Sequence, residues 1–568
     1  MSSYYQAIEP AKLEWKDGTP VSKIFGDVYF SSTQSVTEGI KEGIQEFRHV
    51  FLEKNNLEQR WQQLGKINTA SGFTIIETGF GTGLNFLCAA QLWQKTRPNN
   101  SSQWLEFVST EKHPLTHSDL GKSLQQFPEL NGPAELLIKQ YPPLTPGFHL
   151  IKLPSLKIKL LLLFGDIKDT LPQLTAKADA WFLDGFSPAK NQSMWSTDLF
   201  KQISRLSKPG TSFSTFTAAG VVKKGMRWAG FEVIKSDGFG QKRDMLCGTL
   251  NATVESKHGQ QAVEKKNPDQ LNAADTPWFI TPDNSATKNR TATIIGGGLA
   301  GTTTAYSLAQ RGWQVTILER HAELAEEASG NPAGVLYTKI NGERNPQTEF
   351  YTSSYLYALS FIQQMPRHLP SSRQVVWDNC GVLQLSSQEK INLAKTTKAK
   401  SDSANRFPNE LWPESVVQAV SHEQAEKLCG FGLNKSTLQN FLFFPNAGWV
   451  CPPLLCRTLV KLSDNINIIS NQEVASIEYR TVESGLAQSA SHWLLKDSNK
   501  KTICSSDIVI LANSLGGNQF NQTNYLPLHS VRGQVSSVPE NENSMALKTV
   551  LCHEGYTLPA INRRHCIG

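Results

Sequence analysis

The sequence contains 568 residues, of which 39% are hydrophobic and 19% are charged, with 56 Lys and Arg against 50 Asp and Glu. At roughly 150 residues per domain this length predicts several domains, and the composition excludes collagen-like, coiled-coil and fully disordered chains. No uncharged apolar stretch reaches the roughly 18 residues that cross a bilayer, because the most apolar one, residues 156–164, contains Lys157 and Lys159.

The N-terminus and the cysteines indicate a cytoplasmic chain. The first residues have neither a basic nor an apolar region, so no secretory signal is predicted. The nine cysteines are scattered, odd in number and without the spacing of a zinc site. We therefore expect reduced thiols, no disulfide framework and no metal.

A glycine-rich loop follows a short β-branched run. Residues 73–78 predict a buried strand, and Gly79, Gly81 and Gly83 alternate before the start of a helix. The spacing is GxGxG, with Glu77 two residues before it, and this favours S-adenosylmethionine (SAM) over a dinucleotide. A glycine turn without a ligand is the alternative for this motif taken alone.

Acidic residues stand at the ends of the next predicted strands. Glu111, Asp166 and Asp184 each follow an apolar strand pattern. Since the carboxyl ends of parallel strands meet at one edge of a sheet, these acids predict a ligand crevice. Glu111 is expected to accept hydrogen bonds from both hydroxyls of a ribose. Asp166 is expected to accept one from the amino group of an adenine. For each acid taken alone, a helix cap or a turn is the simpler interpretation.

The segment 183–191, LDGFSPAKN, combines an acid with a turn of Gly, aromatic and Pro residues. This resembles the loop that amino-group methyltransferases place beside the target nitrogen. Methyl transfer needs a neutral amine, so a carboxylate must orient the mostly protonated amine and help remove its proton. Asp184 is the candidate, with Phe186 as a stacking wall for a base. A simple turn is the alternative interpretation of Asp184.

Positive charge is concentrated in the basic window, residues 201–250, which holds nine Lys and Arg against three Asp and Glu, a local balance of +6. On charge alone, a solvated face is the favoured interpretation. A phosphate-binding surface is the sharper interpretation, and it needs nucleic-acid chemistry elsewhere in the chain.

A polar segment separates two halves of the chain. Residues 251–289 are rich in Asn, Gln, Lys, Asp and Thr and have no sustained period, as expected of a linker. Each half begins its own unit of strand, glycine loop and helix. We therefore predict two α/β domains, residues 1–250 and residues 290–568.

The second half opens with a dinucleotide-binding pattern. The strand 291–295 runs into Gly296, Gly298 and Gly301 in the spacing GxGxxG, a helix follows, and the next strand ends in Glu319. Together these elements form the whole fingerprint, including an acid about 20 residues on for a ribose hydroxyl. FAD is favoured over NAD because a second small-residue loop, which contains Ser329, Gly330 and Asn331, comes close after Glu319. A late apolar strand, residues 507–513, is the expected return to the same sheet.

Motifs from both halves resemble one bacterial family. The first half contains ETGFGTGLNFL, STEKHPL, WFLDGFSPAKNQSMW and GFGQKRDML, and the second contains TIIGGGLAG, LERHAELAEEASGNPAGVLY and HSVRGQVS. In this order they resemble the MnmC family, whose bifunctional members complete 5-methylaminomethyl-2-thiouridine in tRNA. The resemblance covers almost the whole chain. It implies a Rossmann-like SAM-dependent methyltransferase domain followed by an FAD-binding α/β oxidoreductase domain of the amino-acid-oxidase type.

The resemblance also implies the reactions and their residues. The flavin domain would remove the carboxymethyl group from 5-carboxymethylaminomethyl-2-thiouridine at the tRNA wobble position, by hydride abstraction beside a secondary amine and hydrolysis of the imine. The methyltransferase domain would then methylate the exposed aminomethyl group. The residues implied are Glu77, Gly79, Gly81, Gly83, Glu111 and Asp166 for SAM, Asp184 for catalysis, and Gly296, Gly298, Gly301, Glu319, Ser329, Gly330 and Asn331 for FAD. Arg532 is a candidate for the substrate carboxylate or a phosphate, with a surface salt bridge as the equal alternative.

Two other functions stay open at this point. One is an amine oxidase fused to an N-methyltransferase that acts on free small molecules, although the basic window argues for tRNA. The other is an active methyltransferase whose flavin domain is an inactive docking module, because the family pattern continues beyond Gly568 and we expect that domain to be incomplete. With tRNA as partner, we expect a monomeric cytoplasmic enzyme that needs neither a metal nor a membrane.

Overall fold

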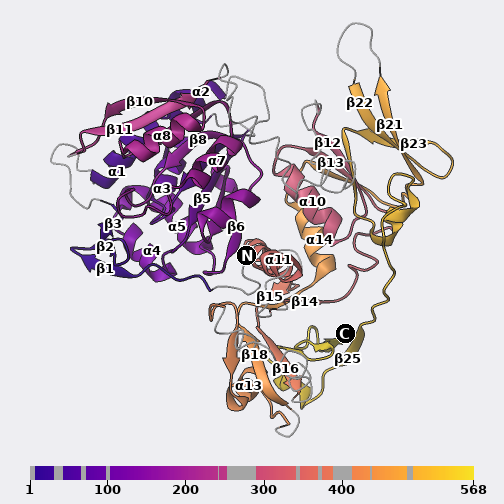
Figure 1. Cartoon of the computed structure of the whole chain (residues 1–568). Helices are drawn as coiled ribbons and strands as arrows, with labels where there is room; N and C mark the ends of the chain where they lie inside the picture. Colours follow the sequence, from indigo (N-terminus) through magenta and orange to yellow (C-terminus); the bar gives the residue numbers. More distant parts are fainter. Residues whose placement is uncertain are drawn as a thin grey trace. The chain divides into compact units, whose positions relative to one another are not determined.

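The chain divides into two compact units in the computed structural model (Figure 1), which describes residues 7–30, 42–64, 72–97, 103–240, 242–251, 289–338, 340, 346–368, 374–387, 412–434, 438–482 and 490–568. The first unit takes mainly residues before 273 and the second mainly those after it, while residues 341–360 and 410–413 group with the first. The predicted linker, 251–289, lies almost wholly outside the described residues, so the predicted domain boundaries stay predictions.

The first unit is built on an eight-stranded sheet in the order β10-β11-β9-β8-β4-β5-β7-β6. Its five middle strands pair in parallel, whereas β6, β11 and β10 pair antiparallel at the two edges. The bounds are β4 (Phe73–Thr78), β5 (Leu105–Glu111), β6 (Gly147–Leu153), β7 (Ile158–Phe164), β8 (Ala178–Leu183), β9 (Ser207–Thr215), β10 (Phe231–Asp237) and β11 (Asp244–Leu250).

The middle strands are apolar on both faces, as strands buried in a parallel sheet must be. Because successive side chains of a strand point to opposite faces, Ile75 and Ile76 of β4 enter two different cores. Phe86 of α3 belongs to the first core, and Met226 of α8 to the second. The helices of this unit are α1 (Glu42–Phe47), α2 (Leu57–Leu64), α3 (Leu84–Thr96), α4 (His117–Leu124), α5 (Asn131–Gln140), α6 (Ile167–Thr170), α7 (Thr197–Leu206) and α8 (Gly220–Trp228).

A small antiparallel sheet near the N-terminus was not predicted. It consists of β1 (Leu13–Lys16), β2 (Thr19–Ser22) and β3 (Asp27–Val28). The turn between β2 and β3 contributes to the candidate site described below.

The second unit contains a four-stranded parallel sheet in the order β20-β13-β12-β24. Helix α10 (Leu299–Ala309) follows β12 directly, and α14 (Pro452–Lys461) packs against it. The strands are β12 (Thr291–Ile295), β13 (Gln314–Leu318), β20 (Ile466–Ile469) and β24 (Ile508–Leu511). Parallel sheets with crossover helices in both units confirm the predicted α/β class.

Further sheets complete the second unit. The largest has seven strands in the order β17-β18-β16-β26-β27-β28-β25, and two others have three strands each, β14-β19-β15 and β21-β22-β23. The bounds are β14 (Gly334–Leu336), β15 (Trp377–Asp378), β16 (Val382–Ser387), β17 (Gln418–Val420), β18 (Leu438–Phe444), β19 (Gly448–Val450), β21 (Ser476–Val482), β22 (Ala490–Lys496), β23 (Thr502–Ser506), β25 (Ser536–Pro539), β26 (Val550–Cys552), β27 (Tyr556–Thr557) and β28 (Arg564–Ile567). Helix α13 (His422–Cys429) also belongs to this unit, whereas α11 (Pro346–Gln363) lies mostly in the segment that groups with the first unit.

Three of the sequence expectations concern membranes, metals and disulfides. Within the described ranges, no helix has the length and apolar character needed to cross a membrane. The same residues contain no group of three His, Cys, Asp or Glu side chains placed to hold a metal ion. All nine cysteines are free thiols.

Candidate functional site

The first glycine loop connects β4 to α3, as predicted. Gly79, Gly81 and Gly83 have φ angles of 86°, 53° and 74°, in the left-handed region that residues with a Cβ rarely adopt. A Cβ at Gly83 would also lie 2.7 Å from the ring of Phe80. The three glycines therefore let the chain turn tightly from the strand into the helix.

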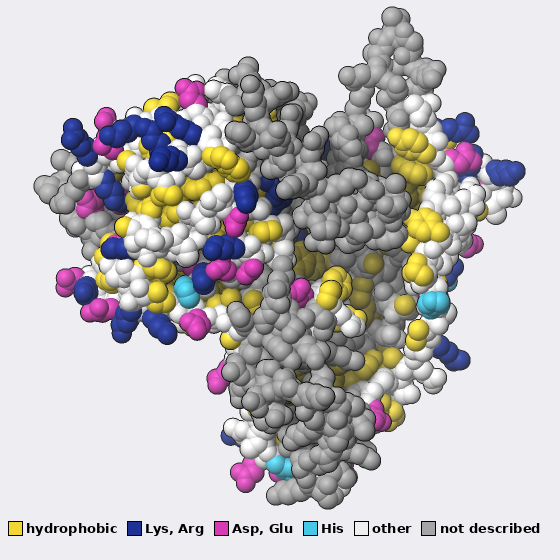
Figure 2. Space-filling model, viewed as in Figure 1, with side chains coloured by type: hydrophobic (Ala, Val, Ile, Leu, Met, Phe, Trp, Pro, Cys, Tyr) yellow, Lys and Arg dark blue, Asp and Glu magenta, His cyan; other side chains and the backbone are white. Residues whose placement is uncertain are grey.

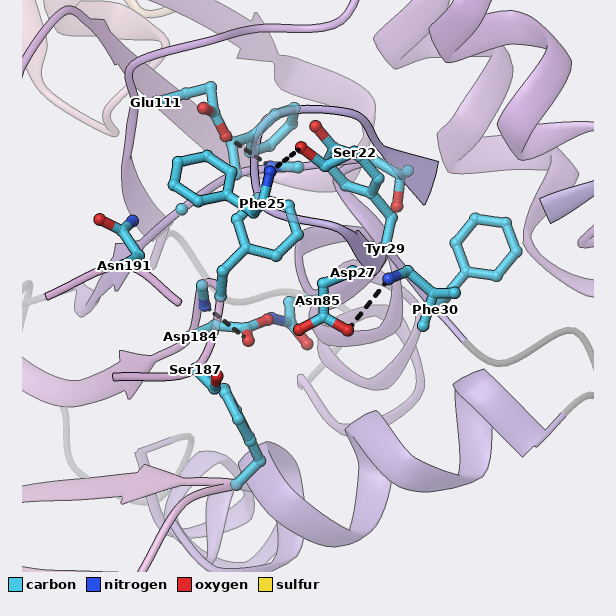
Figure 3. Close-up of a pocket in the computed structure, with 18 of the residues that line it drawn as sticks. Ser22, Phe25, Asp27, Tyr29, Phe30, Asn85, Glu111, Asp184, Ser187 and Asn191 are labelled. Carbon is cyan, nitrogen blue, oxygen red and sulfur yellow. Dashed lines mark hydrogen bonds between the residues drawn. The ribbon is translucent and has the colours of Figure 1, made fainter. Parts of the chain in front are cut away.

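A cavity of about 650 Å³ lies beside this loop, a volume in the range of small-molecule sites (Figure 3). Part of its lining comes from the carboxyl ends of β4, β5, β7 and β8, so the predicted acids meet at the expected edge of the sheet, and another part comes from residues before β4. Glu77 and Gly83 do not line the cavity. The predicted residues that line it are Gly79, Gly81, Glu111, Asp166, Asp184 and Phe186.

Two of these acids have well-defined partners. Glu111 accepts a hydrogen bond from the Gly81 N–H at 2.9 Å through Oε2, and one from the His113 N–H at 2.8 Å through Oε1. Asp166 accepts a hydrogen bond from the Lys112 ammonium group at 2.9 Å. Burial alone would raise the pKa of Asp166, but the hydrogen bonds, first that from Lys112, bring it below its usual value. Asp166 is therefore a charged group on the cavity wall.

Asp184 stands directly after β8 and faces the cavity (Figure 3). Its Oδ1 accepts a hydrogen bond from the Gly185 N–H at 2.8 Å, and its Oδ2 accepts one from the Asn85 amide at 2.7 Å. The surrounding protein replaces bulk water, and this desolvation raises the pKa of Asp184 to about 6 against the effect of the two hydrogen bonds. At pH 7 the carboxyl group is largely ionised. Its pKa is close enough to 7 that the carboxylate can take up a proton.

Glu77 is fully buried. Its Oε1 accepts a hydrogen bond from the Asn85 amide at 2.9 Å, and its Oε2 accepts one from the Ser109 hydroxyl at 2.5 Å. Burial first, and then the nearby charge of Asp184, raise the pKa of Glu77 well above its usual value. Its role at a SAM site stays a prediction, since it touches the cavity only through Asn85, a residue that no sequence motif had singled out.

Aromatic side chains from the N-terminal small sheet pack on Phe186. The ring of Phe25 stacks on it with centroids 4.5 Å apart, and the ring of Tyr29 meets it edge-on at 5.4 Å. An ion pair of 3.3 Å between Asp27 and Lys190 joins the same turn to the loop after β8. Of these residues, Phe25, Asp27, Tyr29 and Phe186 line the cavity, and Lys190 does not. Phe25 and Tyr29 are candidate site residues that no motif in the sequence marks.

Neighbouring acids neutralise much of the basic window. Lys242 is the one Lys or Arg of the window that lines the cavity, and its ammonium group lies 4.5 Å from the Phe216 ring centroid. Figure 2 shows Lys and Arg side chains gathered over α8 and β10. Four Lys residues form ion pairs, namely Lys201 with Asp198 at 3.0 Å, Lys208 with Asp179 at 2.7 Å, Lys235 with Asp244 at 2.6 Å and Lys242 with Glu46 at 2.6 Å. Side chains without a polar partner among the described residues are those of Lys223, Lys224, Arg227 and Arg243.

The second glycine loop is held in the same way as the first. Gly296 has a φ of 107°, and a Cβ at Gly301 would lie 1.9 Å from the carbonyl oxygen of Gly296. Glu319, directly after β13, accepts a hydrogen bond from the Gly297 N–H at 2.8 Å and one from the His321 N–H at 2.9 Å. Glu111 makes the corresponding two bonds in the first unit. In both units, therefore, a glutamate at a strand end anchors the glycine loop.

The other residues predicted for the flavin site are less closely grouped. The Ser329 hydroxyl oxygen accepts a hydrogen bond at 3.1 Å from the first N–H of α10, and a Cβ at Gly298 would lie 2.9 Å from that oxygen. Gly330 follows in the same turn. Asn331 and Arg532 are exposed, and neither side chain has a polar partner in the part of the chain that the structure describes. Their roles stay predictions.

Two family models match the chain in the order of the two glycine loops. A family described as S-adenosyl-L-methionine-dependent methyltransferase matches residues 128–251. A family described as FAD dependent oxidoreductase matches residues 291–568. These matches confirm the predicted pair of enzyme classes and the predicted cofactors, SAM and FAD.

Two named bacterial proteins are similar over almost the whole chain. The tRNA 5-methylaminomethyl-2-thiouridine biosynthesis bifunctional protein MnmC of Chromobacterium violaceum is 42% identical over 98% of this chain and 76% of its own length. The protein of the same name from Ectopseudomonas mendocina is 40% identical, with the same shares covered. Among solved structures, a glycine oxidase from Geobacillus kaustophilus matches 49% of this chain and 70% of its own at 18% identity and a TM-score of 0.37, a likeness too distant to bear on function. The two named proteins support the fused enzyme over the two alternatives, and the chain belongs to the MnmC family of bifunctional enzymes.

Proposed function

We propose that this chain carries out two successive reactions on the wobble uridine of tRNA. The second unit removes the carboxymethyl group from 5-carboxymethylaminomethyl-2-thiouridine with FAD, and the first unit then methylates the aminomethyl nitrogen with SAM. One observation carries the methyl-transfer assignment. Asp184 presents a carboxylate, held through both oxygens, on the wall of the cavity beside the GxGxG loop.

The cavity wall suits the nucleoside part of SAM. Each carboxylate oxygen of Glu111 accepts one backbone hydrogen bond and keeps a further lone pair for a ribose hydroxyl. Asp166 is ionised by its contact with Lys112 and can accept a hydrogen bond from an adenine amino group. A Cβ at Gly81 would lie 3.3 Å from the Tyr29 ring, so the glycine keeps this side of the cavity open. When bound, SAM supplies an electrophilic methyl group.

Asp184 prepares the amine for methylation. An alkyl ammonium group has no free electron pair, so it must lose a proton before its nitrogen forms a bond to carbon. The carboxylate of Asp184 can accept a hydrogen bond from that nitrogen and then take its proton. With a pKa of about 6, Asp184 is mostly ionised near neutral pH and remains basic enough to accept the proton.

The aromatic residues around Phe186 provide a surface for the base. Phe25 and Tyr29 pack on the ring of Phe186, which fixes its position beside Asp184. Stacking of an extruded nucleobase on an aromatic wall is favourable by about 1–3 kcal/mol. A wobble base placed here would bring its 5-aminomethyl group within the same cavity as Asp184.

The residues of the second glycine loop fit FAD. The clash that a Cβ at Gly301 would make means that α10 starts close to the strand, with its free N–H groups available to a diphosphate. Glu319 is placed to accept a ribose hydroxyl, and Ser329 lies at the start of the same helix. When bound, FAD would supply the two-electron oxidising chemistry needed at the carbon beside the substrate amine. Arg532 is the proposed partner of the substrate carboxylate.

The exposed face of α8 is the proposed contact for tRNA phosphates. Lys223, Lys224 and Arg227 lie on this helix, and Arg243 lies before β11, all without a polar side-chain partner among the described residues. When Lys and Arg side chains that are not paired with protein acids bind phosphates, they release the counterions condensed on the nucleic acid. This release makes the binding depend on salt. We propose that the chain acts as a monomer in the cytoplasm.

Mass spectrometry of the wobble nucleoside tests this proposal. tRNA that carries 5-carboxymethylaminomethyl-2-thiouridine is incubated with FAD-loaded protein, first without and then with SAM. The expected products are the aminomethyl nucleoside without SAM and the methylaminomethyl nucleoside with it. Turnover of free secondary amines with unchanged tRNA would contradict the proposal, and methylation without carboxymethyl removal would contradict its flavin half.

A further inference from the structure

Asn85, in the first turn of α3, joins two acidic side chains of the first unit. Its Nδ2 lies 2.9 Å from Glu77 Oε1 and 2.7 Å from Asp184 Oδ2. An amide nitrogen carries two N–H donors, so both are used. The reverse orientation of the amide would place its oxygen against two carboxyl oxygens, and the contacts therefore determine which way the side chain points. Figure 3 shows Asn85 beside Asp184 at the cavity.

We infer that Asn85 is a positioning residue for methyl transfer. One N–H of its amide holds the carboxylate of Asp184, and its second N–H is anchored by Glu77. The inference rests on the proposed role of Asp184. Asp184 has one donor on each oxygen, Gly185 on Oδ1 and Asn85 on Oδ2. Two donors at different oxygens fix the plane of the carboxylate, and removal of either leaves the group free to rotate.

The hydrogen-bond balance of Asn85 argues against a purely structural role. The side chain is 5% exposed, and its Oδ1 is buried without a hydrogen-bond partner among the described residues. An asparagine selected for stability alone would satisfy its carbonyl oxygen, because a buried unpaired acceptor is unfavourable. Asn55, a buried asparagine of the same unit, satisfies both ends of its amide.

The other charged groups near Asp184 give it little net support. Glu77 of β4 carries no ion pair among the described residues, and its burial favours the neutral form. Glu46 of α1 and Lys242, before β11, pair with each other at 2.6 Å, so their effects on Asp184 largely offset. Asn85 is therefore the main side-chain donor that favours the charged form of Asp184. Loss of the Asn85 amide should raise the pKa of Asp184. The acidic limb of the pH–rate profile for methyl transfer should then move to higher pH.

Two variants and a matched control test the inference. Asn85→Ala removes the donor, and Asn85→Asp keeps the shape but replaces the amide with an acid. Single-turnover methyl transfer to tRNA bearing 5-aminomethyl-2-thiouridine is measured from pH 5 to 9. We expect the acidic limb of the pH–rate profile to move up by about one pH unit, so the rate at a pH below the limb should be about tenfold lower than that of wild type. SAM affinity should stay within about threefold of wild type. Asn55→Ala should leave the limb in place.

A double-mutant cycle separates this inference from the proposed function. In an Asp184→Asn background, Asn85→Ala should lower the remaining rate by less than about threefold, because its target is already gone. An unchanged acidic limb in an active Asn85 variant, or an equal loss in both backgrounds, would overturn the inference. Failure of both Asn85 variants to fold while Asn55→Ala folds would also overturn it. Wild-type methylation by Asp184→Asn alone would instead refute the proposed function.

Discussion

Replacement of Glu111 by glutamine should weaken SAM binding sharply although the shape of the side chain is kept. In the structure both carboxylate oxygens accept backbone hydrogen bonds, from Gly81 at 2.9 Å and from His113 at 2.8 Å. Glutamine has only one acceptor oxygen, so its NH2 group must face one of these two N–H groups. The variant therefore loses the anchor of the glycine loop or of the next turn, together with one acceptor for a ribose hydroxyl.

The expected loss follows from the number of bonds affected. A hydrogen bond to a charged group contributes about 1.5–3 kcal/mol, and Glu111 is only partly buried, so the lower half of that range applies to each bond. One backbone bond and one ribose bond together amount to about 3 kcal/mol. At about 1.4 kcal/mol per factor of ten, the Kd for SAM should rise about 100-fold.

Isothermal titration calorimetry with SAM measures this effect, and Glu106→Gln is the matched control. Glu106 lies on the same strand, pairs with Lys159 and does not line the cavity. The control variant should bind SAM within about twofold of wild type, because substitutions at separate sites without shared partners usually act independently. A folded Glu111→Gln variant with wild-type affinity would refute the assignment of Glu111 to the donor site.

Three further predictions concern pH, flavin and salt. Methyl transfer should be lost as the pH falls through about 6, because desolvation raises the pKa of Asp184 to about 6 and the reaction needs its charged form; single-turnover rates that do not change from pH 5 to 8 would contradict this. Gly301→Ala should lower the flavin bound per chain, measured by visible absorbance, because its Cβ would lie 1.9 Å from a backbone oxygen of the loop; full flavin content would count against the assigned FAD site. Reversal of charge at Lys224 and Arg227 together should weaken tRNA binding and reduce the slope of log K against log salt by about 2, whereas Lys201→Glu, at an already paired cation, should change the slope by less than about 0.5.

Strand ends were the most predictable part of this molecule. Glu111, Asp166 and Asp184 are far apart in sequence, yet each follows a strand of one parallel sheet. The geometry of such a sheet brings its carboxyl ends to one edge, so these three cavity-lining acids could be named without coordinates. The glycine loops were predictable for a similar reason, since their spacing reflects backbone angles that other residues rarely adopt.

The alternation of side chains along β4 indicates that Glu77 is buried. Ile75, Ile76 and Glu77 follow one another in β4, so Glu77 points to the same face as Ile75, which lies in the first core. Alternation along the strand would have predicted a buried acid in need of a donor. Asn85 supplies that donor from the helix after the loop.

Contacts between distant segments could not be predicted from patterns along the chain. The stacking of Phe25 on Phe186 depends on where a short N-terminal hairpin folds back. The pairing of Lys208 with Asp179 depends on β8 and β9 lying side by side in the sheet, with Ala178 opposite Ser207. These contacts decide which aromatic side chains wall the cavity and which cations of the basic window stay available. The extra sheets of the second unit were unpredicted for the same reason.

The central claim is that Asp184 activates the amine of a tRNA base for methylation in the cavity beside the GxGxG loop. The most direct test is single-turnover transfer of a labelled methyl group from SAM to tRNA bearing 5-aminomethyl-2-thiouridine, by the wild-type chain and by Asp184→Asn. Asparagine keeps the shape but cannot take the proton, so the rate at pH 7.5 should fall by at least about 100-fold, with SAM affinity within about threefold of wild type. A variant that methylates the tRNA at the wild-type rate would contradict the claim.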